Sequence, residues 1–80
     1  MIMTNRDLNK QYINFITNVK YYRKLNGLTQ EQLAEKAGIS ISYIKQIESV
    51  KCYKNANMTT MLNIAGALNV SLSTLFDEPI

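Results

Sequence analysis

The basic side chains are the residues of this sequence whose placement most clearly indicates a chemistry. All nine Lys and Arg lie at or before Lys54, together with only four Asp and Glu, whereas residues 55–80 carry only Asp77 and Glu78. Clustered positive charge attracts phosphates and releases their counterions on binding. A polyanion such as nucleic acid is therefore one interpretation of the charge pattern, and an uneven solvated surface without a binding role is the other.

Residue types that catalysis requires are missing or scattered. The chain contains no His, which excludes Ser-His and Cys-His nucleophilic pairs. Its carboxylates form no cluster with the spacing of metal ligands, and no Gly-rich phosphate loop is present. The lone cysteine, Cys52, cannot form an internal disulfide and fits a reducing cytosol. We expect no enzymatic activity, no metal and no cofactor.

Length and hydropathy limit the architecture. The 80 residues leave room for one domain, spanning residues 1–80, with a small core. No run of about 18 apolar residues could cross a membrane, and the N-terminal residues lack the apolar region of a secretory signal. We therefore expect a cytoplasmic protein without a membrane partner.

The periodicity of apolar residues predicts helices along the whole chain. Their expected ranges, from periodicity and capping residues, are about 5–25, 30–37, 41–49, 58–68 and 72–76. The predicted fold class is all-α, a compact five-helix bundle with a central helix-turn-helix. The predicted core contains Val19, Tyr22, Leu33, Ala34, Ile44, Ile47, Leu62, Ala65, Leu68, Val70 and Leu75, and Met58 and Met61 are also expected to face inward.

The stretch GISISYIKQIES, residues 38–49, first suggests a strand because apolar Ile39 and Ile41 alternate with polar residues. The alternation fails at Lys45, where a strand would need an apolar side chain. Ser40 is a favourable helix N-cap, and an isolated strand would leave its backbone groups unpaired. We therefore predict a helix.

Two short helices joined by a tight turn predict a helix-turn-helix over residues 30–49. The first helix needs a small residue where the two axes cross, the turn needs a residue that tolerates positive φ, and an apolar residue must follow the turn. The second helix then needs two buried residues. These requirements are met by Ala34, Gly38, Ile39, Ile44 and Ile47.

The segments YYRKLNGLTQEQLAEKAGISISYIKQIE and MTTMLNIAGALNVSLSTLF carry a family resemblance. From about residue 15 to 76, the chain resembles the lambda-repressor-like helix-turn-helix family, the Cro/repressor type of phage and bacterial regulators. The resemblance implies a sequence-specific regulator of transcription, a repressor, that binds double-stranded DNA and associates with the nucleoid. It also implies that the helix at 41–49 reads the major groove.

Site residues follow from the resemblance by position. The outward side chains of the second helix are implied to contact bases, and these are Ile41, Ser42, Lys45 and Gln46. Gln30, at the start of the first helix of the motif, matches a residue that bonds a backbone phosphate. The remaining implied backbone contacts are Tyr43, Lys51, Tyr53 and Lys54. Arg23 and Glu48 are implied to form a structural ion pair.

The chain departs from the family pattern at three places. Val50 stands where the family usually has Gly, and Ala56 stands at a common Pro position in a loop about two residues longer. Residues 1–14 extend the first helix upstream. Three roles remain open for this extension: DNA contact through Arg6 and Lys10, contact with a partner subunit, or packing on its own domain.

A homodimer on a palindromic operator is expected, because one recognition helix reads too few base pairs to be selective. The expected dimer surface lies around Leu72, Phe76 and Ile80, or on the helix extension. No small-molecule ligand is indicated. The alternative is a protein-interaction module that retains the fold without specific DNA binding, and exposed apolar side chains at the recognition helix would favour it. The basic residues Lys20, Lys24, Lys45, Lys51 and Lys54 argue against it.

Overall fold

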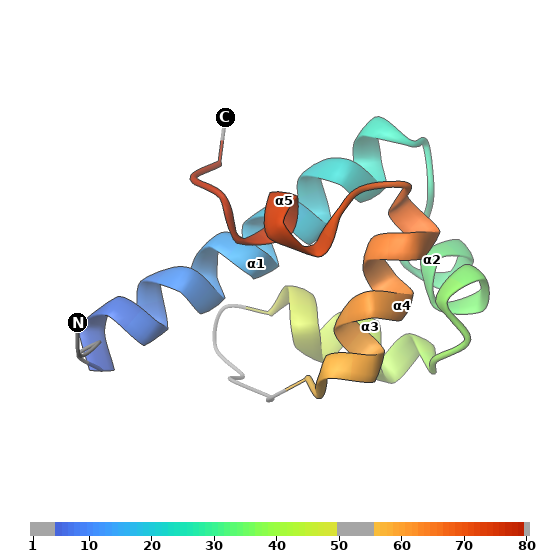
Figure 1. Ribbon diagram of the computed structural model, residues 1–80. Helices are drawn as coiled ribbons and strands as arrows, with labels where there is room; N and C mark the ends of the chain where they lie inside the picture. Colours follow the sequence, from blue (N-terminus) through green and yellow to red (C-terminus); the bar gives the residue numbers. More distant parts are fainter. Residues whose placement is uncertain (1–4, 50–55, 80) are drawn as a thin grey trace.

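The computed structural model describes residues 5–49 and 56–79, with side chains in the first helix from Lys10 onward. Within these residues there is no strand, which confirms the predicted all-α class. The helices are α1 (Asn5–Leu25), α2 (Gln30–Ala37), α3 (Ile41–Glu48), α4 (Met58–Leu68) and α5 (Leu72–Phe76). Figure 1 shows α1 running along the molecule, with α5 beside it and α2, α3 and α4 gathered at its C-terminal half.

The helix boundaries agree closely with those expected from the sequence, because the predicted caps are present. Ser40, Asn57 and Ser71 each accept a hydrogen bond from the backbone N–H three residues later, which satisfies a donor left free at a helix start. Only α3 differs, since it ends at Glu48 and Ser49 is its C-cap. Within the described residues, no helix combines the length and apolar character needed to span a bilayer.

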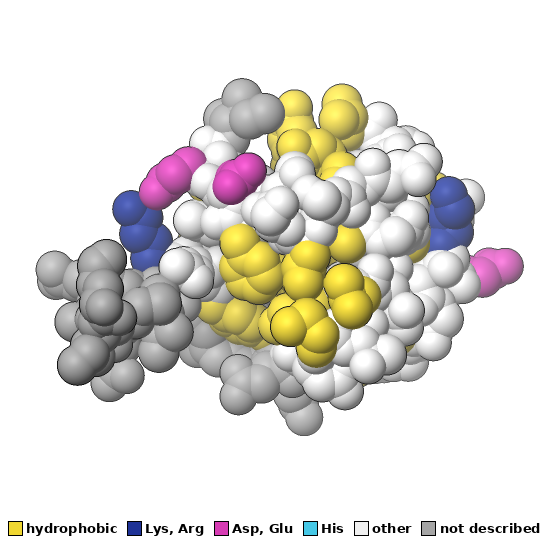
Figure 2. Space-filling model, viewed as in Figure 1, with side chains coloured by type: hydrophobic (Ala, Val, Ile, Leu, Met, Phe, Trp, Pro, Cys, Tyr) yellow, Lys and Arg dark blue, Asp and Glu magenta, His cyan; other side chains and the backbone are white. Residues whose placement is uncertain are grey.

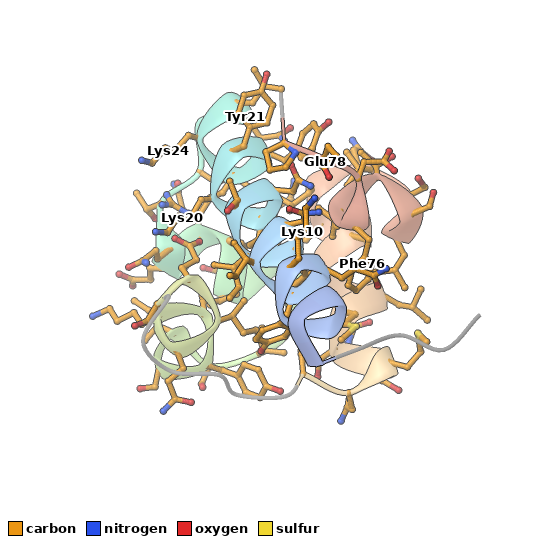
Figure 3. The ribbon with its side chains drawn as sticks, turned by 90° about the vertical axis from the view of Figure 1, so that its left-hand side faces the viewer. Lys10, Lys20, Tyr21, Lys24, Phe76 and Glu78 are labelled. Carbon is orange, nitrogen blue, oxygen red and sulfur yellow. The ribbon has the colours of Figure 1, made fainter. Side chains whose placement is uncertain are left out.

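The described part of the α1 extension packs on its own domain. The ring of Phe15 lies 5.2 Å from that of Phe76 in α5 and 6.3 Å from that of Tyr12. Lys10 forms an exposed ion pair with Glu78 at 3.1 Å, and the two side chains point toward each other in Figure 3. Within residues 10–14, Tyr12 therefore packs against the core of its own chain and Lys10 pairs with Glu78.

Asn18 makes an anchoring contact between α1 and the end of α5 that the sequence analysis missed. Its side chain is buried, and Nδ2 donates to the carbonyl oxygens of Leu75 at 2.9 Å and Asp77 at 2.8 Å, with Thr74 farther away at 3.3 Å. These carbonyls end a helix too short to be stable alone. The signal was present in the sequence, because Asn18 lies three residues after Phe15 on the same apolar stripe.

The register of α4 corrects part of the predicted core. Leu62 and Met58, both expected inside, are 52% and 61% exposed, whereas Ile64 is fully buried. Residues two positions apart lie about 200° apart around a helix, so Ile64 and Leu62 cannot face the same side. The prediction was wrong because α4 has apolar residues on nearly every face. The observed buried apolar residues are Phe15, Ile16, Val19, Leu33, Ala34, Ala37, Ile44, Ile47, Ala56, Ile64, Ala65, Leu68 and Leu75.

Candidate nucleic-acid interface

Caps at both ends of α2 fix the helix-turn-helix. At the start of α2, the Thr29 hydroxyl accepts from the backbone N–H of Gln32 at 3.0 Å, and Gln32 Oε1 accepts from the Thr29 backbone at 2.9 Å. This reciprocal pair is the predicted capping box. At the other end, Gly38 adopts φ 72°, ψ 32°, a left-handed conformation that costs glycine little. The Ile39 backbone N–H then bonds the Ala34 carbonyl at 3.0 Å and closes the turn.

Helix α3 presents a row of polar side chains on a buried foundation. Ile44 and Ile47 are fully buried, and they hold α3 against the core. Ser42, Lys45 and Gln46 are exposed on the opposite side. Lys45 and Gln46 follow Ser42 by three and four residues, so the three side chains share one face of the helix. The row offers hydroxyl, ammonium and amide groups to whatever lies against α3.

Ile41 does not lie fully outward, as was expected of a residue that contacts bases, and Tyr43 lies at the flank of α3. Both are half-buried and pack against the core. Ile41 precedes Ile44 by three residues and Tyr43 precedes Ile47 by four, so each flanks the buried stripe on one side. The prediction that Ile41 projects wholly away from the core was therefore wrong, and its exposed part borders the polar row.

The predicted pairing of Arg23 with Glu48 is present and joins α1 to α3. Arg23 Nε donates to Glu48 Oε2 at 2.8 Å and Nη2 donates to Oε1 at 3.1 Å, while Nη1 donates to the Leu28 carbonyl at 2.8 Å. The side chains of Arg23 and Glu48 are 12% and 2% exposed. A buried carboxylate needs such partners, because an unpaired charge away from water is strongly unfavourable. The pair fixes the C-terminal end of α3 to α1 and to the turn before α2.

Gln30 takes part in the same network, which the sequence did not reveal. Its Nε2 donates to Glu48 Oε1 at 3.1 Å, so the side chain expected to bind a phosphate is anchored in the absence of DNA. The half-buried amide lies in the first turn of α2. One of its two N–H groups is used by Glu48, which leaves the other available to an acceptor at the start of the helix.

Comparison with known proteins places this geometry in a family. A family model described as helix-turn-helix matches residues 19–75. The chain belongs to the lambda-repressor-like helix-turn-helix family. No curated protein matches the sequence.

Solved structures agree with this membership. SinR, described as the master regulator for biofilm formation and solved in complex with DNA, is 35% identical, with a TM-score of 0.73 over 79% of this chain and 98% of that chain. A complex of the SinR and SinI proteins matches at 36% identity and a TM-score of 0.73, over 80% of this chain and 61% of that chain. A hypothetical transcription factor from Neisseria, NHTF, shares the fold at 24% identity and a TM-score of 0.80, over 88% of this chain and 76% of that chain.

Further basic residues lie on the side of the helix-turn-helix. Lys20 and Lys24, four residues apart in α1, point toward the side of α2 and α3 in Figure 3, while Phe76 lies on the other side of α1. Positive charge is thus present on the side of α1 where α2 and α3 lie. Three implied phosphate contacts, Lys51, Tyr53 and Lys54, lie outside the described residues, as does Val50.

Proposed function

We propose that this member of the helix-turn-helix family is a sequence-specific, double-stranded DNA-binding repressor of transcription. In this proposal residues 1–80 act as one DNA-binding domain, and a homodimer occupies a palindromic operator. Helix α3 reads base edges in the major groove. Bound at a promoter, the dimer prevents access of RNA polymerase.

The observation that carries the proposal is the exposed polar row of α3, backed by buried Ile44 and Ile47. The major groove is wide enough to admit an α-helix. There, the Gln46 amide suits adenine N6 and N7, and Lys45 suits guanine O6 and N7 or a phosphate. Ser42 can bond either kind of base edge, and the exposed part of Ile41 suits a thymine methyl group. Buried Ile44 and Ile47 hold these side chains in position before DNA binds.

Contacts to the DNA backbone would set the register of the reading helix. Gln30 stands at the start of α2, where free backbone N–H groups and the helix dipole favour a phosphate. Its remaining amide N–H is suited to donate to that phosphate. We propose the same role for Tyr43, and for Lys51, Tyr53 and Lys54 from their sequence positions. The solved complex of the 35% identical SinR with DNA supports a DNA partner for this chain.

The rival role, a protein-interaction module without specific DNA binding, rested on apolar exposure at the tip of α3. Ile41 and Tyr43 are instead half-buried against the core. What α3 exposes is mainly polar, as in a surface that reads hydrogen-bonding patterns. The observation that would have favoured the rival role is thus weakened.

Selection of bound sequences from a random duplex pool tests the proposal. We expect a palindrome with half-site centres about 34 Å apart, or a multiple of that spacing. Affinity for the selected site should fall log-linearly with salt concentration. No enriched sequence, together with no retention of duplex DNA at low salt, would refute the proposal.

Two matched variants then test the reading helix. Gln46→Ala should reduce discrimination at one base pair in each half-site by about 5- to 100-fold. Gln11→Ala changes an exposed glutamine of α1 in the same way and should leave discrimination unchanged. Equal effects of both variants would contradict the assignment of α3. In cells, a reporter placed behind the selected operator should be repressed by the wild type and released by Gln46→Ala.

A further inference from the structure

The Glu48 carboxylate has a second contact besides its ion pair with Arg23. Its Oε2 accepts from Arg23 Nε, while its Oε1 accepts from both Arg23 Nη2 and Gln30 Nε2. The side chain is 2% exposed, so its oxygen atoms depend on protein donors. One buried carboxylate thus connects an ion pair inside the fold to a half-buried amide at the start of α2.

The carboxylate determines which way round the Gln30 amide lies. An ionised carboxylate only accepts hydrogen bonds, whereas a glutamine amide has a donating end, Nε2, and an accepting end, Oε1. The reversed amide would place Gln30 Oε1 against Glu48 Oε1, two oxygen atoms without a proton between them. Glu48 therefore holds Nε2 toward the C-terminal end of α3. Because the amide group is planar, the second N–H of Nε2 then has a fixed direction.

Arg23 makes this arrangement compatible with a nearby phosphate. A carboxylate without a counter-charge, only one side chain away from a DNA phosphate, would repel it. The Arg23 guanidinium lies 2.8 Å from Glu48 Oε2 and 3.1 Å from Oε1 and balances the charge. Gln30 is thus anchored to a neutral pair through one N–H, and its other N–H is available to a phosphate oxygen.

The distribution of charge agrees with a phosphate on this side of the molecule. Figure 2 shows a face with apolar side chains in its middle and with Lys and Arg only at its margins. Lys20 and Lys24 point instead toward the side of α2 and α3 in Figure 3, and these helices carry Gln30 and Glu48. A polyanion is attracted to the side that carries the positive charge.

We propose that Glu48 is a positioning residue for DNA binding, which orients the Gln30 amide so that Nε2 donates to a backbone phosphate. The inference rests on the proposed function, because it explains how the phosphate contact of Gln30 is prepared. Ordering a mobile glutamine side chain lowers affinity by up to about 10- to 30-fold. A hydrogen bond to a charged group raises affinity by about 10- to 150-fold. A fixed amide therefore retains affinity that a mobile amide would largely lose.

A variant that keeps the fold without the carboxylate separates positioning from stability. Arg23→Met with Glu48→Met removes both charges together and so leaves no unpaired charge in the core. Methionine also offers Gln30 only a weak acceptor. Circular dichroism should show native helix content for this double variant. Gln30→Ala removes the amide itself and is the reference for complete loss of the contact.

Duplexes in which single phosphates are replaced by neutral methylphosphonates measure the contact. Each linkage in one half-site of the selected operator is replaced in turn, and the affinity of the full chain is measured. At one linkage, the replacement should weaken wild-type binding by at least about 10-fold and Gln30→Ala binding by less than about 3-fold. Arg23→Met with Glu48→Met should behave as Gln30→Ala does at that linkage and as the wild type does at all others.

Nuclear magnetic resonance relaxation of side-chain amide nitrogens, without DNA, tests the orientation step alone. In the wild type, the order parameter of Gln30 Nε2 should approach about 0.85, the value of rigid backbone. The amide of Gln11, an exposed glutamine of α1, should lie below about 0.6. In Arg23→Met with Glu48→Met, the order parameter of Gln30 should fall to the level of Gln11.

Three results would overturn the inference: a double variant that keeps the Gln30-dependent response, a double variant that changes the response equally at every linkage, or a wild-type Gln30 amide as mobile as that of Gln11. Each leaves specific DNA binding by α3 intact. Absence of duplex binding by the wild type would instead refute the proposed function together with the phosphate role of Gln30. The order parameters would then still decide whether Glu48 fixes the amide.

Discussion

Truncation of Glu48 to alanine should destabilise the fold strongly. The carboxylate accepts two hydrogen bonds from Arg23 and one from Gln30, and its side chain is 2% exposed. Glu48→Ala leaves the Arg23 guanidinium with a side chain only 12% exposed and without its counter-charge. Removal of one partner from a buried pair costs about 3–5 kcal/mol. For a domain of this length each kcal/mol lowers Tm by about 4–8 °C, so Tm should fall by at least about 12 °C.

Thermal unfolding followed by circular dichroism measures this effect. Glu35→Ala is the matched control, because Glu35 is an exposed glutamate of a neighbouring helix, and it should change Tm by only a few degrees. Replacement of both partners, Arg23→Met with Glu48→Met, should recover much of the loss, since no unpaired charge is then buried. The reasoning is refuted if Glu48→Ala melts within a few degrees of the wild type, or if the double variant is less stable than Glu48→Ala.

Two further predictions concern side chains that pack around α1 and α5. Asn18→Ala should lower the free energy of unfolding by about 2–3 kcal/mol in urea titration, because it removes the Nδ2 bonds to the end of α5; Asn63→Ala, at an exposed site in α4, should have little effect, and equal losses would contradict the anchoring role. The pKa of Tyr12 is raised above its ordinary value of 10.0, mainly by burial and to a smaller extent by the nearby Tyr43. The neutral phenol is therefore favoured in the folded state, and this contribution is complete below pH 10.0 and is lost as pH rises through the raised pKa. Tyr12→Phe should consequently flatten the decline of stability above pH 10.0, and an unchanged decline would show that Tyr12 is not its source.

The helix boundaries could be predicted from the sequence because helix capping depends only on residues close together in the chain. Thr29, Ser40, Asn57 and Ser71 each act on a backbone donor three residues away, and such contacts depend on the neighbouring residues alone. The turn at Gly38 was predictable for the same reason, since a left-handed conformation favours glycine wherever it occurs. Resolution of the apparent strand at residues 38–49 into a helix also needed only the failed alternation and the cap.

The faces of the helices were predictable only where polar and apolar residues alternate clearly. In α3, exposed Lys45 and Gln46 define the outer side, and Ile44 and Ile47 the inner side. Helix α4 lacks this contrast, so its pattern allowed Leu62 to be placed inside, although the fold buries Ile64 instead. Family resemblance could not correct this, because it assigns roles to positions and not exposure to each side chain.

The sequence by itself determined the all-α class, the helix-turn-helix and the polar residues that α3 presents. Each of these depends on short-range spacing and capping. Tertiary structure decided the contacts between residues far apart in the chain. It joined Gln30 to the pair of Arg23 and Glu48, attached Asn18 to the end of α5, and turned Leu62 to the surface. These outcomes depend on how the helices pack together, and no local pattern specifies that packing.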